Sequence, residues 1–169
     1  MIWQPAWLRG ALVRGSTLRR STLRRSTWII GVALVCVAAG AGGQTVKPMS
    51  VWSGVYTAAQ NQRGAELHAA VCVMCHGPRL NGAGQSEMPP SPAIAGATFL
   101  RKWAGRNVAA LFVYVRRTMP TDSPGTLTDQ QAADTIAHML AVSGMPAGDK
   151  ELPPDPNALA NIVIEAQPR

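Results

Sequence analysis

Two cysteines and a histidine form the most chemically specific pattern in the chain, Cys72-Val73-Met74-Cys75-His76. Two thiols separated by two residues and followed at once by an imidazole predict covalent attachment of a c-type haem. The thiols would add across the two haem vinyl groups, and the next residue would offer its imidazole to the iron. The pattern therefore predicts one haem c, held by two thioethers at Cys72 and Cys75, with His76 as an iron ligand.

Three other uses of this cysteine pair are weaker. A thioredoxin-like redox pair requires a βαβ context, which the sequence does not suggest, and gives no reason for the histidine. A structural zinc site requires a second pair of ligands, and none has suitable spacing. A disulfide across only two intervening residues would be strained.

The iron needs a second axial donor unless the position is open for catalysis. The candidates are Met88, Met119, Met139, Met145, His68 and His138. Met119 is favoured, because it stands 43 residues after His76 in a segment expected to be non-helical. His68 lies on the same approach to the motif as His76, so it is poorly placed for the opposite face.

Helical spacing and capping signals predict an all-α fold of three or four helices with long Gly/Pro-rich loops and no sheet. The expected helices cover residues of about 58–71, 99–104, 108–118 and 129–143. Thr57 with Gln60, and Thr128 with Gln131, have the spacing of capping boxes. Proline disfavours the α conformation in the preceding residue, so the third helix must end before Met119. Such a small core needs a filler, which a haem would supply.

The basic character of the chain belongs to its first residues. The net charge is +7 at pH 7, yet residues 44–169 hold ten basic and nine acidic side chains. The excess comes from six arginines: Arg9, Arg14, Arg19, Arg20, Arg24 and Arg25. An apolar run over residues 28–43 follows them and ends in small residues, as in a secretory signal. We expect export to the periplasm, with residues 1–43 as a signal peptide or membrane anchor, and no nucleic-acid partner.

Several segments together resemble a class I, mono-haem cytochrome c over residues 57–146. They are Cys72–His76, the Gly/Pro loop, Thr118-Met119-Pro120, Pro124–Thr128 and Ala137-His138-Met139-Leu140. An extended lead-in at 44–56 precedes this domain, and a Pro-rich tail at 147–169 follows it. Val51–Thr57, Gly144–Gly148 and Glu151–Pro153 are similar to the small cytochromes c associated with, or fused to, quinoprotein alcohol dehydrogenases.

The resemblance implies a class I cytochrome c fold, in which the first and last helices cross near Gly64. It implies His76 and Met119 as the axial ligands. It also implies that the Pro92 carbonyl orients His76, and that Trp103 and Arg106 meet the haem propionates. Two positions depart from the family, because His68 and His138 stand where aromatic residues are usual. We expect the two imidazoles to meet at the helix crossing, with a pH-sensitive contact or an alternative haem ligand as the other possibilities.

A haem with both axial positions filled leaves no place for substrate, so the resemblance implies a single-electron carrier rather than an enzyme. Its partners would be a periplasmic dehydrogenase as donor and another cytochrome or a terminal oxidase as acceptor. A peroxidase-like haem enzyme, or a gas sensor with a displaceable Met119, is the alternative. Residues 88–121 carry five basic and no acidic side chains, which predicts docking on an acidic patch.

Overall fold

Four helices of eight or more residues form the framework of the described chain in the computed structural model, which covers residues 47–83, 91–166 and 168. They are α1 (Ala58–Leu67), α3 (Gly96–Trp103), α4 (Val108–Thr118) and α5 (Asp129–Val142). The expected architecture of helices joined by long loops is confirmed. The expected leader at 1–43 and the candidate ligand Met88 lie outside the described residues.

Local capping signals set two of these helices as the sequence predicts. The Thr128 hydroxyl accepts from the Gln131 backbone N–H, and the Gln131 side chain accepts from the Thr128 N–H, which completes the capping box of α5. Asn107 caps α4, which ends at Thr118 because Met119 adopts the extended conformation before Pro120.

The capping box predicted for α1 is wrong in one of its two bonds. The Thr57 hydroxyl does accept from the Gln60 backbone N–H at 3.1 Å. The Gln60 carboxamide, however, donates to the Leu152 carbonyl at 2.9 Å and accepts from the Leu152 N–H at 2.7 Å. Gln60 is fully buried, so tertiary hydrogen bonds to the tail satisfy its amide in place of the local one.

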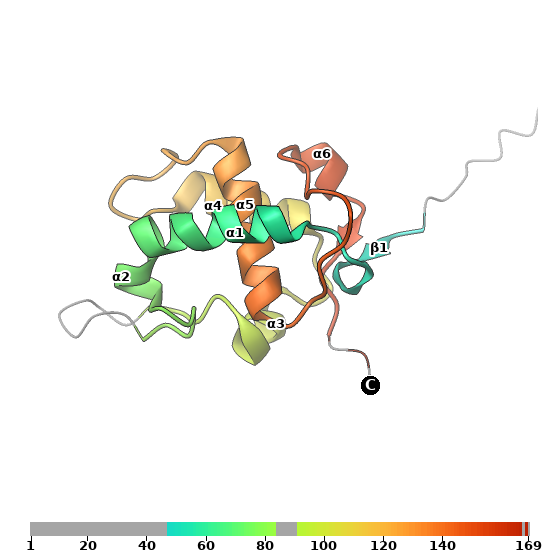
Figure 1. The fold of residues 1–169 in the computed structure, drawn as a ribbon, viewed down its shortest axis with the longest axis horizontal. Helices are drawn as coiled ribbons and strands as arrows, with labels where there is room; N and C mark the ends of the chain where they lie inside the picture. The colour runs from blue at the N-terminus through green and yellow to red at the C-terminus, as the bar shows by residue number, and fades with distance from the viewer. Residues whose placement is uncertain (1–46, 84–90, 167, 169) are drawn as a thin grey trace, which may run out of the picture. The chain divides into compact units, whose positions relative to one another are not determined.

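Helices α1 and α5 cross in contact at Gly64, as Figure 1 shows. A Cβ at Gly64 would overlap the Asp134 carbonyl, so only glycine allows the two backbones to approach this closely. The charged side chains beside the crossing are paired, since Arg63 bonds Asp134 at 2.9 Å and Glu151 at 2.9 Å. The crossing near Gly64 that the resemblance implies is therefore present.

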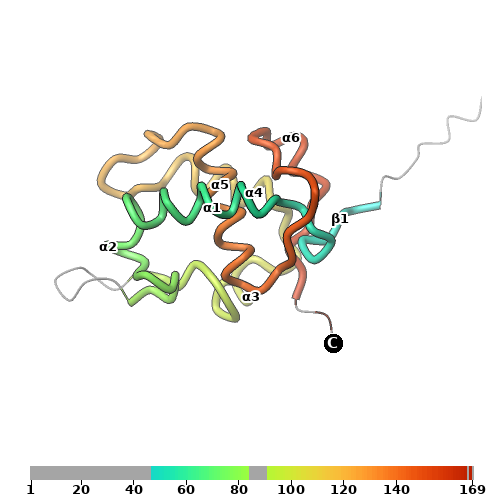
Figure 2. The backbone as a smooth tube through the Cα atoms, viewed as in Figure 1, coloured from blue at the N-terminus to red at the C-terminus, as the bar shows by residue number. Residues whose placement is uncertain are grey.

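The tail is part of the core and not an appendage. Leu152, Leu159 and Ile164 are fully buried. Leu152 precedes the short helix α6 (Pro156–Leu159), Leu159 ends it, and Ile164 follows strand β2 (Ile162–Val163). This strand pairs in parallel with β1 (Met49–Ser50), so the two ends of the described domain lie side by side (Figure 2). The expectation of no sheet is therefore wrong, because these two strands of two residues each do pair. Strands this short leave no periodic signal in the sequence.

No helix within residues 47–83 and 91–166 combines the length and the apolar character needed to cross a bilayer.

Candidate haem-binding site

The cysteine motif follows α1 without a loop. After Leu67 the helix widens into a π-helical turn, His68–Cys72, and then continues as α2 (Val73–His76). The predicted helix of 58–71 therefore starts where expected but runs on through the motif. π-Helical insertions are frequent at functional sites, since they rotate the side chains that follow them. Cys72 and Cys75 are both free, partly buried thiols. Burial, and then the nearby Cys75, raise the pKa of the Cys72 thiol.

His76 is held by the carbonyl of Pro92. The His76 Nδ1–H donates to Pro92 O at 3.0 Å, which leaves the lone pair on Nε2 for a metal. Burial lowers the pKa of His76, although the hydrogen bond to Pro92 opposes the effect. The buried side chain is therefore kept as the neutral imidazole, which is the form that binds iron.

A second histidine fixes the chain directly after the motif. The His68 Nε2–H donates to the Gly77 carbonyl at 2.9 Å. Gly77 has a φ of 73°, and a Cβ there would overlap the Ala83 carbonyl. His68 thus supports the turn that follows His76, and nothing in the sequence beyond its helical spacing indicates this role. Its imidazole is directed at this carbonyl, so it has no free Nε2 for iron.

His138 also lies at the helix crossing and not in the cavity. Its Nδ1–H donates to Asn61 Oδ1 at 2.9 Å, and its ring centroid lies 5.6 Å from that of His68. The two rings are tilted by 47°. The structure therefore brings the two imidazoles into contact, as expected, but in a tilted arrangement.

One cavity of about 340 Å³ joins the predicted site residues. Cys72, Cys75 and His76 line it together with Met119, which is partly buried at the end of α4. Pro92 and Trp103 also line it. The rest of the lining is mostly apolar and includes Ile94, Leu111, Val115, Leu127 and Met139. Its volume is typical of a ligand cavity.

A cluster of donors lies at the same cavity. The Lys102 ammonium is 5.7 Å from the centre of the Trp103 ring and 5.2 Å from that of Tyr114, and all three residues line the cavity. Their side chains make no hydrogen bond to another described residue. The ammonium, the indole N–H and the phenol O–H are therefore available to donate hydrogen bonds to an anion in the cavity. Arg106 lies 5.4 Å from the Trp103 ring but is not among the lining residues. Sequence reasoning singled out Arg106 and missed Lys102 for this role.

The residues present fit a haem c. Two free thiols, a neutral imidazole and a thioether line one apolar cavity, and a cationic and hydrogen-bonding cluster is suited to the two carboxylates of a haem. Of the other candidate ligands, Met139 lines this cavity as well, whereas Met145 and His138 do not.

Comparison with known proteins agrees with this description. Residues 59–139, just under half of the chain, match the family described as cytochrome c oxidase, cbb3-type, subunit III. No curated protein and no solved structure matches the chain. The match and the helical fold support a class I c-type cytochrome domain over these residues, the kind of domain that binds haem c covalently and exchanges electrons with redox proteins.

Proposed function

We propose that the protein is an exported mono-haem cytochrome that carries single electrons. It would accept them from a periplasmic, quinoprotein-type dehydrogenase and pass them to another cytochrome or a terminal oxidase. One observation carries the proposal. His76, at the end of α2, and Met119, directly after α4, line the same mostly apolar cavity as the two thiols. The apolar run at 28–43 supports export, in which residues 1–43 would act as a signal peptide or as a membrane anchor.

Each site residue has a defined task in this proposal. Cys72 and Cys75 form the thioethers, and His76, oriented by Pro92, binds the iron through Nε2. Met119 would supply the second ligand through its thioether, which would favour the ferrous state and raise the potential. When bound, the haem supplies a one-electron ferric/ferrous couple. With His76 and Met119 as its two ligands, the iron would have no position open to a substrate, and the mostly apolar lining would limit the access of water.

Trp103, Lys102 and Tyr114 would hold the haem propionates. Arg106 would act on them through Trp103, because it contacts this ring and does not line the cavity. A cation near these carboxylates keeps them ionised in a partly buried site.

Electrons would enter and leave over the rim of the cavity. Val71, Met74 and Tyr114 line the cavity, and each is between 38% and 43% exposed. Exposed apolar side chains gathered at one opening are typical of a protein contact surface. A redox partner that covers this rim would come close to the haem without a change of ligand.

A spectrum of the exported protein tests the proposal. We expect a haem-positive band on a denaturing gel, a low-spin spectrum and the weak far-red band of iron–methionine ligation. Met119→Ala should abolish the far-red band, whereas Met139→Ala, which alters the same cavity, should retain it. A covalent but high-spin haem in the wild type, with strong carbon monoxide binding, would instead favour the haem enzyme or gas sensor.

A further inference from the structure

A buried hydroxyl on α5 is left without a partner at the haem cavity. Thr135 is only 5% exposed and lines this cavity, and its Oγ1 makes no hydrogen bond within the described residues. Buried hydroxyls are nearly always hydrogen-bonded, so an unused one in a ligand cavity points to an acceptor that the occupied site supplies.

Its own helix does not satisfy this hydroxyl. A threonine within a helix commonly bonds the carbonyl four residues earlier, which here belongs to Gln131. Thr135 does not make that bond, so its hydroxyl remains available to the cavity. Leu111 and Leu127, which are buried and line the same cavity, are apolar and offer no acceptor.

We propose that Thr135 is a positioning residue for Met119, and that its hydroxyl donates a hydrogen bond to the Met119 sulfur once that sulfur is directed at the iron. Both residues line one cavity, and they come from the end of α4 and from α5, which pack against each other. A thioether sulfur is a weak acceptor with a lone pair left over after it binds a metal. The inference rests on the proposed function, because it requires Met119 as the ligand.

The hydrogen bond would have two effects on the iron site. It would orient the thioether and slow its displacement by other ligands, as contacts to metal ligands generally do. It would also withdraw electron density from the sulfur, which favours the ferrous state and raises the reduction potential.

The test compares Thr135→Val, which keeps the shape and removes the hydroxyl, with Thr135→Ser, which keeps the hydroxyl. In the haem-loaded protein we expect Thr135→Val to lower the midpoint potential and to let imidazole displace Met119 about fivefold more readily, the size of one net hydrogen bond. Thr135→Ser should remain close to the wild type in both measurements.

Other outcomes separate this inference from the proposed function. A wild-type spectrum without the iron–methionine band would overturn both. If the band is present and Thr135→Val has wild-type potential and imidazole affinity, only the role of Thr135 is overturned. The same holds if Thr135→Val and Thr135→Ser shift both quantities equally, because a packing change would then explain them.

Discussion

Single hydrogen bonds to main-chain carbonyls hold the histidine that would bind the iron and the residue that follows it. The Pro92 carbonyl selects the Nδ1–H tautomer of His76, and the His68 side chain holds the Gly77 carbonyl one residue further on. Both contacts use a main-chain oxygen, so they depend on the path of the loop and not on a particular partner side chain. At this scale two histidines are oriented by main-chain carbonyls, and of these two only His76 lines the cavity.

His138 makes the stability of the protein depend on pH. Burial, and then the charge of His68, lower its pKa below the ordinary value of 6.5. As the pH falls, the unfolded chain therefore binds a proton at this residue before the folded protein does. The contribution of neutral His138 is complete above about pH 6.5 and is lost as the pH falls toward its lowered pKa.

Urea unfolding of the wild type and of His138→Gln, at about pH 7.5 and about pH 5, measures this dependence. We expect the wild type to lose more of its free energy of unfolding on acidification than the variant does. Glutamine can still donate to Asn61, so the comparison isolates the titration. Equal losses in the two proteins would show that His138 is not responsible.

Among the elements, the crossing of α1 and α5 tolerates no added atom at Gly64. Alanine should favour a helix by about 1 kcal/mol over glycine at such a position. Its Cβ would overlap the Asp134 carbonyl and crowd His138. We expect Gly64→Ala to lower the free energy of unfolding by about 2 kcal/mol, because the helices must separate.

Denaturant unfolding checks this value, with Gln62→Ala as the control on the exposed face of α1. The control should change the free energy of unfolding by no more than about 0.5 kcal/mol. A Gly64→Ala protein as stable as the wild type would mean that the helices cross less closely than described.

The elements that carry local signals are those the sequence predicts well. Caps at Asn107 and Thr128, and a proline after Met119, fix the bounds of α4 and α5 to within a residue. The second bond of Gln60 could not be foreseen, since its partner Leu152 is 92 residues away. The pairing of β1 with β2 is equally non-local.

The residues of the candidate site also fall into two groups, those that a local sequence pattern predicts and those that depend on tertiary packing. The thiols and His76 follow from their spacing, and Met119 follows from its place before Pro120. The hydrogen bond from His68 to Gly77, and the position of Lys102 at the cavity, depend on how the π-helical turn and α3 are packed. No pattern within a short window of sequence records such packing.

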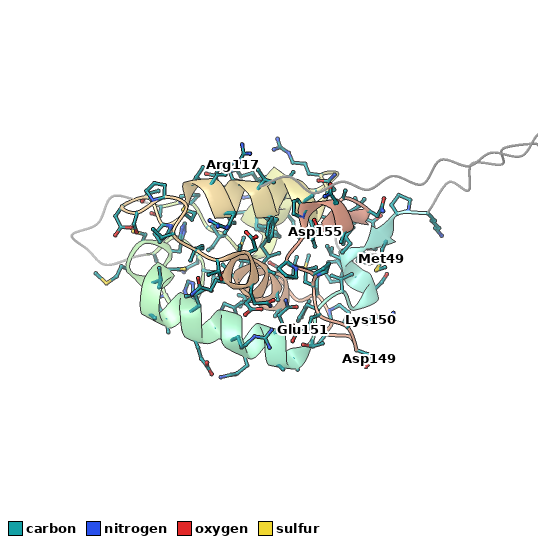
Figure 3. All side chains as sticks on the ribbon, turned by 90° about the horizontal axis from the view of Figure 1, so that it is seen from above. Met49, Arg117, Asp149, Lys150, Glu151 and Asp155 are labelled. Atoms are coloured by element: carbon teal, nitrogen blue, oxygen red, sulfur yellow. The ribbon has the colours of Figure 1, made fainter. Side chains whose placement is uncertain are left out.

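For the molecule as a whole, ion pairing changes which charges are available to a partner. Arg116 bonds Asp129 at 2.7 Å and the Gly125 carbonyl at 2.7 Å, so its charge is partly neutralised. The other basic residues of the 88–121 segment form no ion pair within the described residues. They are Arg101, Lys102, Arg106 and Arg117. Arg117 lies well away from the acidic Asp149 and Glu151 (Figure 3).

Reversal of one exposed charge tests the docking of this segment. We expect Arg117→Glu to slow electron transfer with an acidic redox partner several-fold at low salt, because it weakens electrostatic steering. The difference should shrink as salt rises. Lys150→Glu is the matched control, since Lys150 is a surface cation remote from Arg117 in Figure 3. Equal effects of the two reversals, or none, would contradict docking through the 88–121 segment.

The parallel pairing of β1 with β2 has a consequence for attachment. Because these strands lie together, the chain enters and leaves the described domain at one end, while α2 with Cys75 and His76 lies at the other (Figure 1). A bilayer anchor ahead of Lys47, or a fused domain after the tail, would be attached at the end of the described domain that carries β1 and β2. Attachment at that end would not by itself cover the surface around Cys75 and His76, so immobilisation and electron exchange would use different parts of the described domain.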